Sequence, residues 1–110
     1  MDFKRGNIFT KALMPADGTE LTEIILDQNR FRIERIVSDG QSTPDGLWYD
    51  QPGDEWVILL QGDAVVEFEE SGDISLSKGD YLWIPPHVRH RVKFTSNKPQ
   101  CIWLACHSSQ

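Results

Sequence analysis

Two short stretches carry the residues whose types and spacing could do chemistry. His87 and His90 stand three apart in the segment PPHVRHRVKF. Glu55 begins the apolar run EWVILL, and Asp50 lies five residues before it. Imidazole nitrogens and carboxylate oxygens bind divalent metals, and the same groups take up and release protons. These residues therefore predict either a metal site or a site of proton transfer.

Strand alternation separates the histidine from the basic residues around it. In a β-strand, alternate side chains point to opposite faces, so His90 shares a face with Val92 and Phe94. The three cations between them lie on the other face. Apolar company predicts that His90 points inward, either to a ligand or to a core position where backbone or water meets its nitrogens.

A carboxylate at the start of a buried strand needs a partner. Glu55 shares a strand face with Val57 and Leu59. Burying the charged form alone costs several kcal/mol, so Glu55 requires a cation, a histidine or a proton. In the preceding stretch, Trp48 and Asp50 lie on one face.

The elements that must position these residues are short and have a period of two. Turn residues separate about eight to ten strands, and sustained helical spacing is absent. The clearest segments are 23–28, 30–37, 55–60, 64–70, 74–76, 81–85, 88–94 and 101–107. This pattern predicts an all-β sandwich or barrel over residues 21–110, after an irregular arm over residues 1–20. Ile36 and Val37 break the alternation of their strand, which predicts a bulge or a twist near Arg35.

Composition narrows the function classes. The chain has 110 residues and a net charge of −6, an acidic balance that argues against nucleic-acid binding. It has no apolar run long enough to span a membrane and no apolar signal core. Cys101 and Cys106 face opposite sides of one strand, and such free thiols suit a reducing compartment. We therefore expect a cytoplasmic protein.

The stretch that contains Asp50 and Glu55 resembles the first motif of the cupin superfamily. That motif runs His-x-His, three or four residues, Glu, six residues, Gly. With four intervening residues, Trp48 and Asp50 take the two histidine positions, and Glu55 and Gly62 match.

The stretch that contains His87 and His90 is similar to the second cupin motif. That motif runs Gly, five residues, Pro, x, Gly, two residues, His, three residues, Asn. Gly79, Pro85 and His90 match, while His87 replaces the second glycine and Phe94 the asparagine. The resemblance covers residues 30–107 and implies a double-stranded β-helix, or jelly-roll barrel.

In the family, the motif histidines and glutamate hold a divalent metal inside the barrel. Carried over by position, the resemblance implies a metal site of Asp50, Glu55 and His90, with Trp48 and His87 lining the cavity. Manganese, iron, zinc or nickel are the candidate ions, and two carboxylates favour hard ions such as Mn or Fe(II) over copper. The alternative is a hydrogen-bonded Glu55–His90 pair without metal.

Two functions stay open at this point. One is a metal-dependent enzyme acting on a small polar molecule, with Glu55 or His87 as general base. The other is a barrel that binds or senses a small molecule without turnover.

A homodimer is expected by analogy with similar cupins. The basic residues are expected to be solvated and to balance acidic neighbours, rather than to form an anionic-ligand site: Arg30, Arg32, Arg35, Arg89, Arg91 and Lys93. The facing of His107 is ambiguous.

Overall fold

The computed structural model describes residues 3–108, which form eight strands and no helix. The strands are β1 (Leu21–Asp27), β2 (Phe31–Ser38), β3 (Glu55–Gln61), β4 (Ala64–Phe68), β5 (Gly72–Leu76), β6 (Tyr81–Ile84), β7 (His90–Thr95) and β8 (Cys101–Ser108). No helix within this part of the chain is long and apolar enough to cross a membrane.

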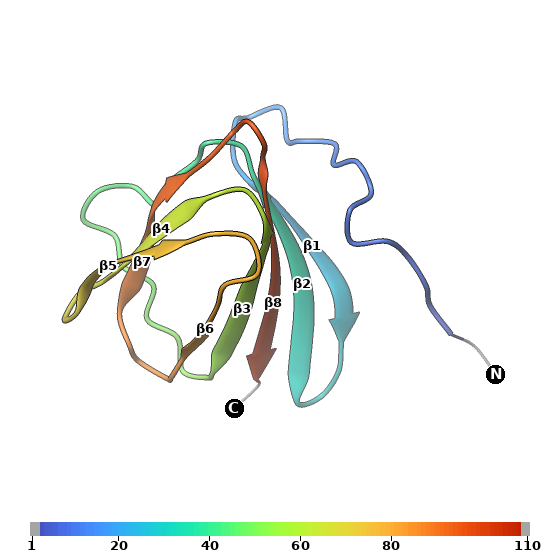
Figure 1. The fold of residues 1–110 in the computed structure, drawn as a ribbon. Coiled ribbons are helices and arrows are strands. Elements are labelled where there is room, and N and C mark those ends of the chain that lie inside the picture. Colours follow the sequence, from blue (N-terminus) through green and yellow to red (C-terminus); the bar gives the residue numbers. More distant parts are fainter. Residues whose placement is uncertain (1–2, 109–110) are drawn as a thin grey trace.

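The strands form two antiparallel sheets that face each other (Figure 1). The larger sheet has the order β1-β2-β8-β3-β6, and the smaller has the order β5-β4-β7. Strands distant in the sequence are neighbours, since β8 lies between β2 and β3. The prediction of an all-β jelly-roll barrel is confirmed.

The core lies between the two sheets. Val57, Leu59 and Trp103 enter it from the larger sheet, and Val66 and Leu76 enter it from the smaller one. The predicted alternation along β3 is confirmed, because Glu55 is buried on the same face as Val57 and Leu59.

Of the two alternatives predicted near Arg35, a bulge or a twist, the bulge is wrong. Strand β2 pairs with β8 without a register shift from Phe31 to Ser38, and the shift lies instead in β1, between Ile24 and Leu26. Ile36 lines the interior and Val37 is buried on the opposite face. The alternation of β2 looked broken because both of its faces are covered.

The predicted inward facing of Phe94 is also wrong. The β4–β7 pairing passes from Val66–Val92 directly to Val65–Phe94, so β7 contains one extra residue. Such a bulge reverses the facing of every residue after it. Phe94 is consequently half exposed, and Thr95 is buried in its place.

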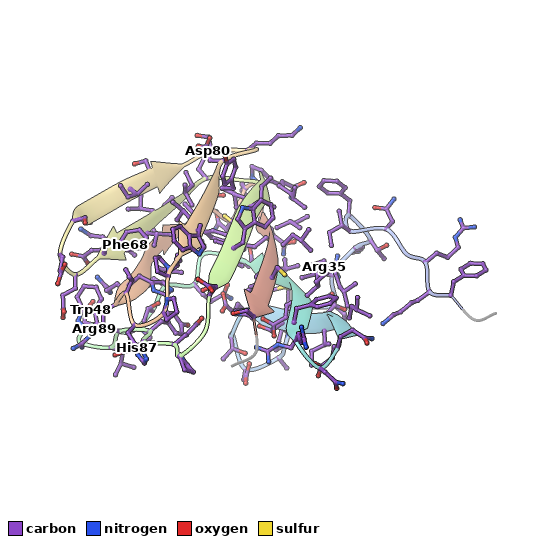
Figure 2. All side chains as sticks on the ribbon, turned by 90° about the horizontal axis from the view of Figure 1, so that it is seen from below. Arg35, Trp48, Phe68, Asp80, His87 and Arg89 are labelled. Carbon is purple, nitrogen blue, oxygen red and sulfur yellow. The ribbon has the colours of Figure 1, made fainter. Side chains whose placement is uncertain are left out.

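The N-terminal segment, residues 3–20, contains no strand and is tied to the outer face of β2 by Arg35. The Arg35 guanidinium donates to the carbonyl oxygens of Ile8, at 3.2 Å, and Thr10, at 2.5 Å. It also pairs with Glu23 of β1. Figure 2 shows Arg35 on the side of the barrel that faces this segment.

Replacing Arg35 with methionine should therefore release the N-terminal segment. Lost hydrogen bonds to a charged group predict a fall of about 1.5–3 kcal/mol in the free energy of unfolding. Hydrogen exchange should also accelerate at residues 8–10. Arg30→Met removes the same charge from an exposed position and should change neither quantity. Unchanged exchange in Arg35→Met would show that other contacts hold the segment.

Candidate ligand-binding cavity

A cavity of about 260 Å³ opens between the two sheets. Its polar lining is concentrated in one row of the larger sheet, where Arg32, His107 and Glu55 lie opposite one another on β2, β8 and β3. Four residues further along β2, Ile36 lies opposite Trp103, and both line the cavity. The cavity thus offers both charged groups and apolar surface.

Glu55 and His90 face each other across this cavity from opposite sheets. His90 Nε2 lies 3.6 Å from Glu55 Oε1, and both side chains are almost fully buried. His90 Nδ1 lies 2.9 Å from the carbonyl oxygen of Val88, which can only accept a hydrogen bond. The Nδ1 atom therefore carries hydrogen, and Nε2 is the atom directed at the carboxylate.

The surroundings of His90 raise its pKa above the ordinary value of 6.5. Burial on its own lowers the pKa, since it disfavours the charged imidazolium. The Glu55 carboxylate facing Nε2 and the hydrogen bond to Val88 together outweigh burial. The pair is thus able to hold a proton close to neutral pH.

A second acid–histidine pair lines the same cavity. His107 Nε2 lies 2.8 Å from Glu34 Oε1, and Arg32 Nε donates to Glu34 Oε2 at 3.2 Å. The ambiguous facing of His107 is thus resolved toward the interior. Arg32 balances an acidic neighbour as expected and is 41% exposed, but both it and Glu34 line the cavity. An inward polar residue at a cavity has the same alternation signal as an outward one, so this position was not predicted from the sequence.

Tyr49 and Gln51 occupy the cavity positions that were predicted for Trp48 and Asp50. Both line the cavity wall, and Tyr49 is joined to His90 by two backbone hydrogen bonds. The cupin motif allows three or four residues before its glutamate, and the three-residue spacing assigns its two histidine positions to Tyr49 and Gln51. The three-residue spacing therefore predicts the two cavity residues that the four-residue spacing does not.

Asp50 and His87 instead contact each other outside the cavity. His87 Nδ1 lies 2.8 Å from Asp50 Oδ1, and both side chains are largely exposed. Neither they nor Trp48 is among the cavity-lining residues, so the prediction that Trp48 and His87 line it is wrong. Figure 2 shows Trp48, His87 and Arg89 at one end of the molecule. His87, which stands at the second glycine position of the motif, has a φ of 62°, in the left-handed region that favours glycine.

The side chains at the cavity do not fit a divalent metal held as in the family. Among residues 3–108, no three His, Cys, Asp or Glu side chains stand close enough together to hold one. Burial, with the charges of Glu20 and Glu55, raises the pKa of Tyr49, so its phenol stays protonated. Of the predicted ligands, the structure brings Glu55 and His90 together and leaves Asp50 apart.

The fold and the position of this site define a cupin barrel. Residues 35–107 match the family model of the cupin domain, and the chain belongs to this family. A solved structure from Ralstonia eutropha JMP134 is 39% identical, covers 97% of this chain and 99% of its own, and superposes with a TM-score of 0.90. That protein bears the provisional name mannose-6-phosphate isomerase.

More distant comparisons agree on the fold. A cupin superfamily protein from Desulfitobacterium hafniense superposes over 100% of this chain and 95% of its own, with 21% identity and a TM-score of 0.76. Two curated 3-hydroxyanthranilate 3,4-dioxygenases, from Ruegeria pomeroyi and Shewanella woodyi, are 39% identical over 46 residues. That match covers 39% of this chain and 26% and 24% of the two enzymes, so the chain spans about a quarter of their length.

Proposed function

We propose that this protein is a small-molecule-binding cupin whose cavity holds one proton, rather than a metal, between Glu55 and His90. The observation that carries the proposal is the 3.6 Å separation of two buried, facing acceptor atoms. A carboxylate oxygen and an imidazole lone pair repel each other unless a cation lies between them. Because no third His, Cys, Asp or Glu side chain within residues 3–108 joins this pair closely enough to hold a metal, we assign a proton as the cation between them.

The size of the cavity supports a small ligand. Its volume of about 260 Å³ lies just below the range of about 300–1,000 Å³ that is usual for ligand pockets. Apolar side chains around Trp103 would contact the body of the ligand, while the Glu55–His90 pair would bind a hydroxyl or amine on it. The names of the relatives refer to small substrates. We do not assign any of those substrates to this protein.

Proton transfer is a second candidate function, favoured by one observation. His90 is fixed by Val88 so that only Nε2 can exchange its proton with a bound molecule. A histidine held in one orientation beside a carboxylate is a suitable general acid or base. Enzymatic turnover would then require a ligand that carries an exchangeable proton next to Nε2.

Metal analysis is the first test, because the family resemblance predicts a divalent metal. Untagged protein should contain well below one equivalent of manganese, iron, zinc or nickel after gel filtration. Ligand-induced thermal shifts from a panel of small polar compounds should be equal with and without EDTA. A stoichiometric metal that is lost in both Glu55→Ala and His90→Ala would overturn the proposal in favour of a metal centre.

A homodimer is also proposed, on the basis of the outer face of the larger sheet. Trp56 lies opposite Trp83 on β3 and β6, and the side chains of Trp56, Tyr81 and Trp83 are 38%, 64% and 62% exposed. Aromatic residues of this kind are enriched at protein interfaces. Light scattering should give twice the chain mass, and Trp83→Glu should reduce the dimer to a monomer.

The expected cytoplasmic location stays a prediction that cell fractionation tests.

A further inference from the structure

We infer that Arg32, Glu34 and His107 form a second subsite of the cavity, which binds the carboxylate of a small hydroxycarboxylic acid. This inference rests on the proposed function, because it assigns the other end of the same ligand to the Glu55–His90 pair. It adds the chemical class of the ligand, which that pair alone does not determine.

The donor groups of Arg32 are held ready for an anion. Its Nε atom is bonded to Glu34 at 3.2 Å, while no partner within residues 3–108 is found for its two terminal nitrogens. The side chain is 41% exposed and lines the cavity, so these nitrogens are open to a ligand. Two parallel N–H donors in one plane match the two oxygens of a carboxylate.

Glu34 and His107 fix this guanidinium rather than neutralising the subsite completely. Glu34 accepts from Arg32 through Oε2 and from His107 Nε2 through Oε1, so both oxygens of its carboxylate are engaged. Because Nε2 of His107 donates this bond, Nδ1 of the neutral ring can only accept, and His107 therefore positions Glu34 rather than donating to the ligand carboxylate. The three side chains thus form a fixed polar group in which the terminal nitrogens of Arg32 are the donors that are not used internally.

The spacing of the two subsites suggests the length of the ligand. Arg32, His107 and Glu55 lie opposite one another on three adjacent strands. With neighbouring strands about 4.8 Å apart, the Cα atoms of Arg32 and Glu55 are separated by roughly 10 Å. After the side chains are allowed for, a molecule with a carboxylate at one end and a hydroxyl at the other spans both. Glu20, Glu34 and Glu55 all line the cavity, which disfavours a second negative charge on the ligand.

Matched pairs of acids and amides test this inference. 3-Hydroxypropanoate and 3-hydroxypropanamide, and 3-hydroxybenzoate and 3-hydroxybenzamide, differ in charge but hardly in shape. Titrations followed by NMR should show each acid binding the wild-type protein at least about 10-fold more tightly than its amide, as expected for a charge-assisted hydrogen bond. Arg32→Gln should abolish this preference by weakening the acid alone. Arg30→Gln removes an equal charge from an exposed position two residues away and should leave it intact.

The outcomes separate this inference from the proposed function. If each amide binds as tightly as its acid and both depend on Glu55, the carboxylate subsite is wrong and the proposed function stands. If Arg32→Gln folds normally and keeps the preference, the subsite is likewise overturned. If inorganic phosphate binds more tightly than every acid, the ligand class is wrong. If no acid or amide binds the wild-type protein, the proposed function fails together with the inference.

Discussion

Replacing His90 with leucine should lower the free energy of unfolding by about 1–3 kcal/mol at pH 6, because Glu55 is then left buried without its proton-sharing partner. The side chains of Glu55 and His90 are only 11% and 6% exposed, so bulk water compensates little of this loss. Adding Glu55→Leu to His90→Leu should restore much of the stability, since no buried charge is left. Urea unfolding of the four proteins in this double-mutant cycle measures the coupling between the two residues.

The coupling should depend on pH in a defined direction. Because the pKa of His90 is raised above 6.5 in the folded protein, the protonated pair contributes stability that is fully present below pH 6.5. That contribution is lost as the pH rises through the folded-state pKa. The coupling energy should therefore be large at pH 6 and small at about pH 9.

An exposed pair provides the control for this cycle. Arg89 and Glu69 lie 3.7 Å apart, and each side chain is nearly half exposed. Their coupling should be at most about 1 kcal/mol, as is usual for surface ion pairs. A Glu55–His90 coupling no larger than this, or one unchanged between pH 6 and about pH 9, would show that the two residues do not share a proton.

Replacing Gly62 with alanine should destabilise the protein by about 3 kcal/mol, combining backbone strain with a steric clash. Gly62 follows β3 and has a φ of 90°, a backbone conformation that residues with a side chain rarely adopt. An added Cβ would lie 2.8 Å from Ser96 Oγ and 3.0 Å from Cys101 Cα. The second contact is with backbone, so it cannot be relieved by moving a side chain.

Gly72 separates the two contributions. Its φ of 85° is nearly the same as that of Gly62, but an added Cβ would meet nothing within 4 Å. Gly72→Ala should therefore show only the conformational cost, about 1–2 kcal/mol. Equal losses of stability in the two variants, measured by urea unfolding, would contradict the close packing at the β3–β4 turn.

Much of the fold could be predicted from the sequence, because short alternating strands and turn residues are local signals. The eight strands and the inward facing of Glu55 and His90 follow from alternation within single strands. Alternation fails at a bulge, where one extra residue turns Phe94 outward, and no local signal marks that residue. Alternation also gives the same pattern for a residue that faces solvent and one that faces a polar cavity, which is why the position of Arg32 and Glu34 in the cavity lining was not predicted.

The candidate site was less predictable, because its residues come from segments without a fixed spacing. If three residues rather than four separate the second histidine position of the motif from Glu55, the two histidine positions fall on Tyr49 and Gln51 instead of Trp48 and Asp50. The structure places Tyr49 and Gln51 at the cavity wall. His107 meets Glu34 only because β2 and β8 are neighbours in the larger sheet. Strand neighbours so distant in the sequence follow from the topology of the whole barrel.

The titration of the His90 imidazole, followed by NMR of its ring nitrogens, tests most directly whether Glu55 and His90 share a proton. In untreated wild-type protein, His90 should titrate at a pKa above 6.5, with its Nδ1 hydrogen retained throughout. In Glu55→Gln the pKa should fall, because the favourable charge is removed while burial persists. An Nε2 signal that does not titrate until EDTA is added would show a bound metal in place of the proton and would contradict the account.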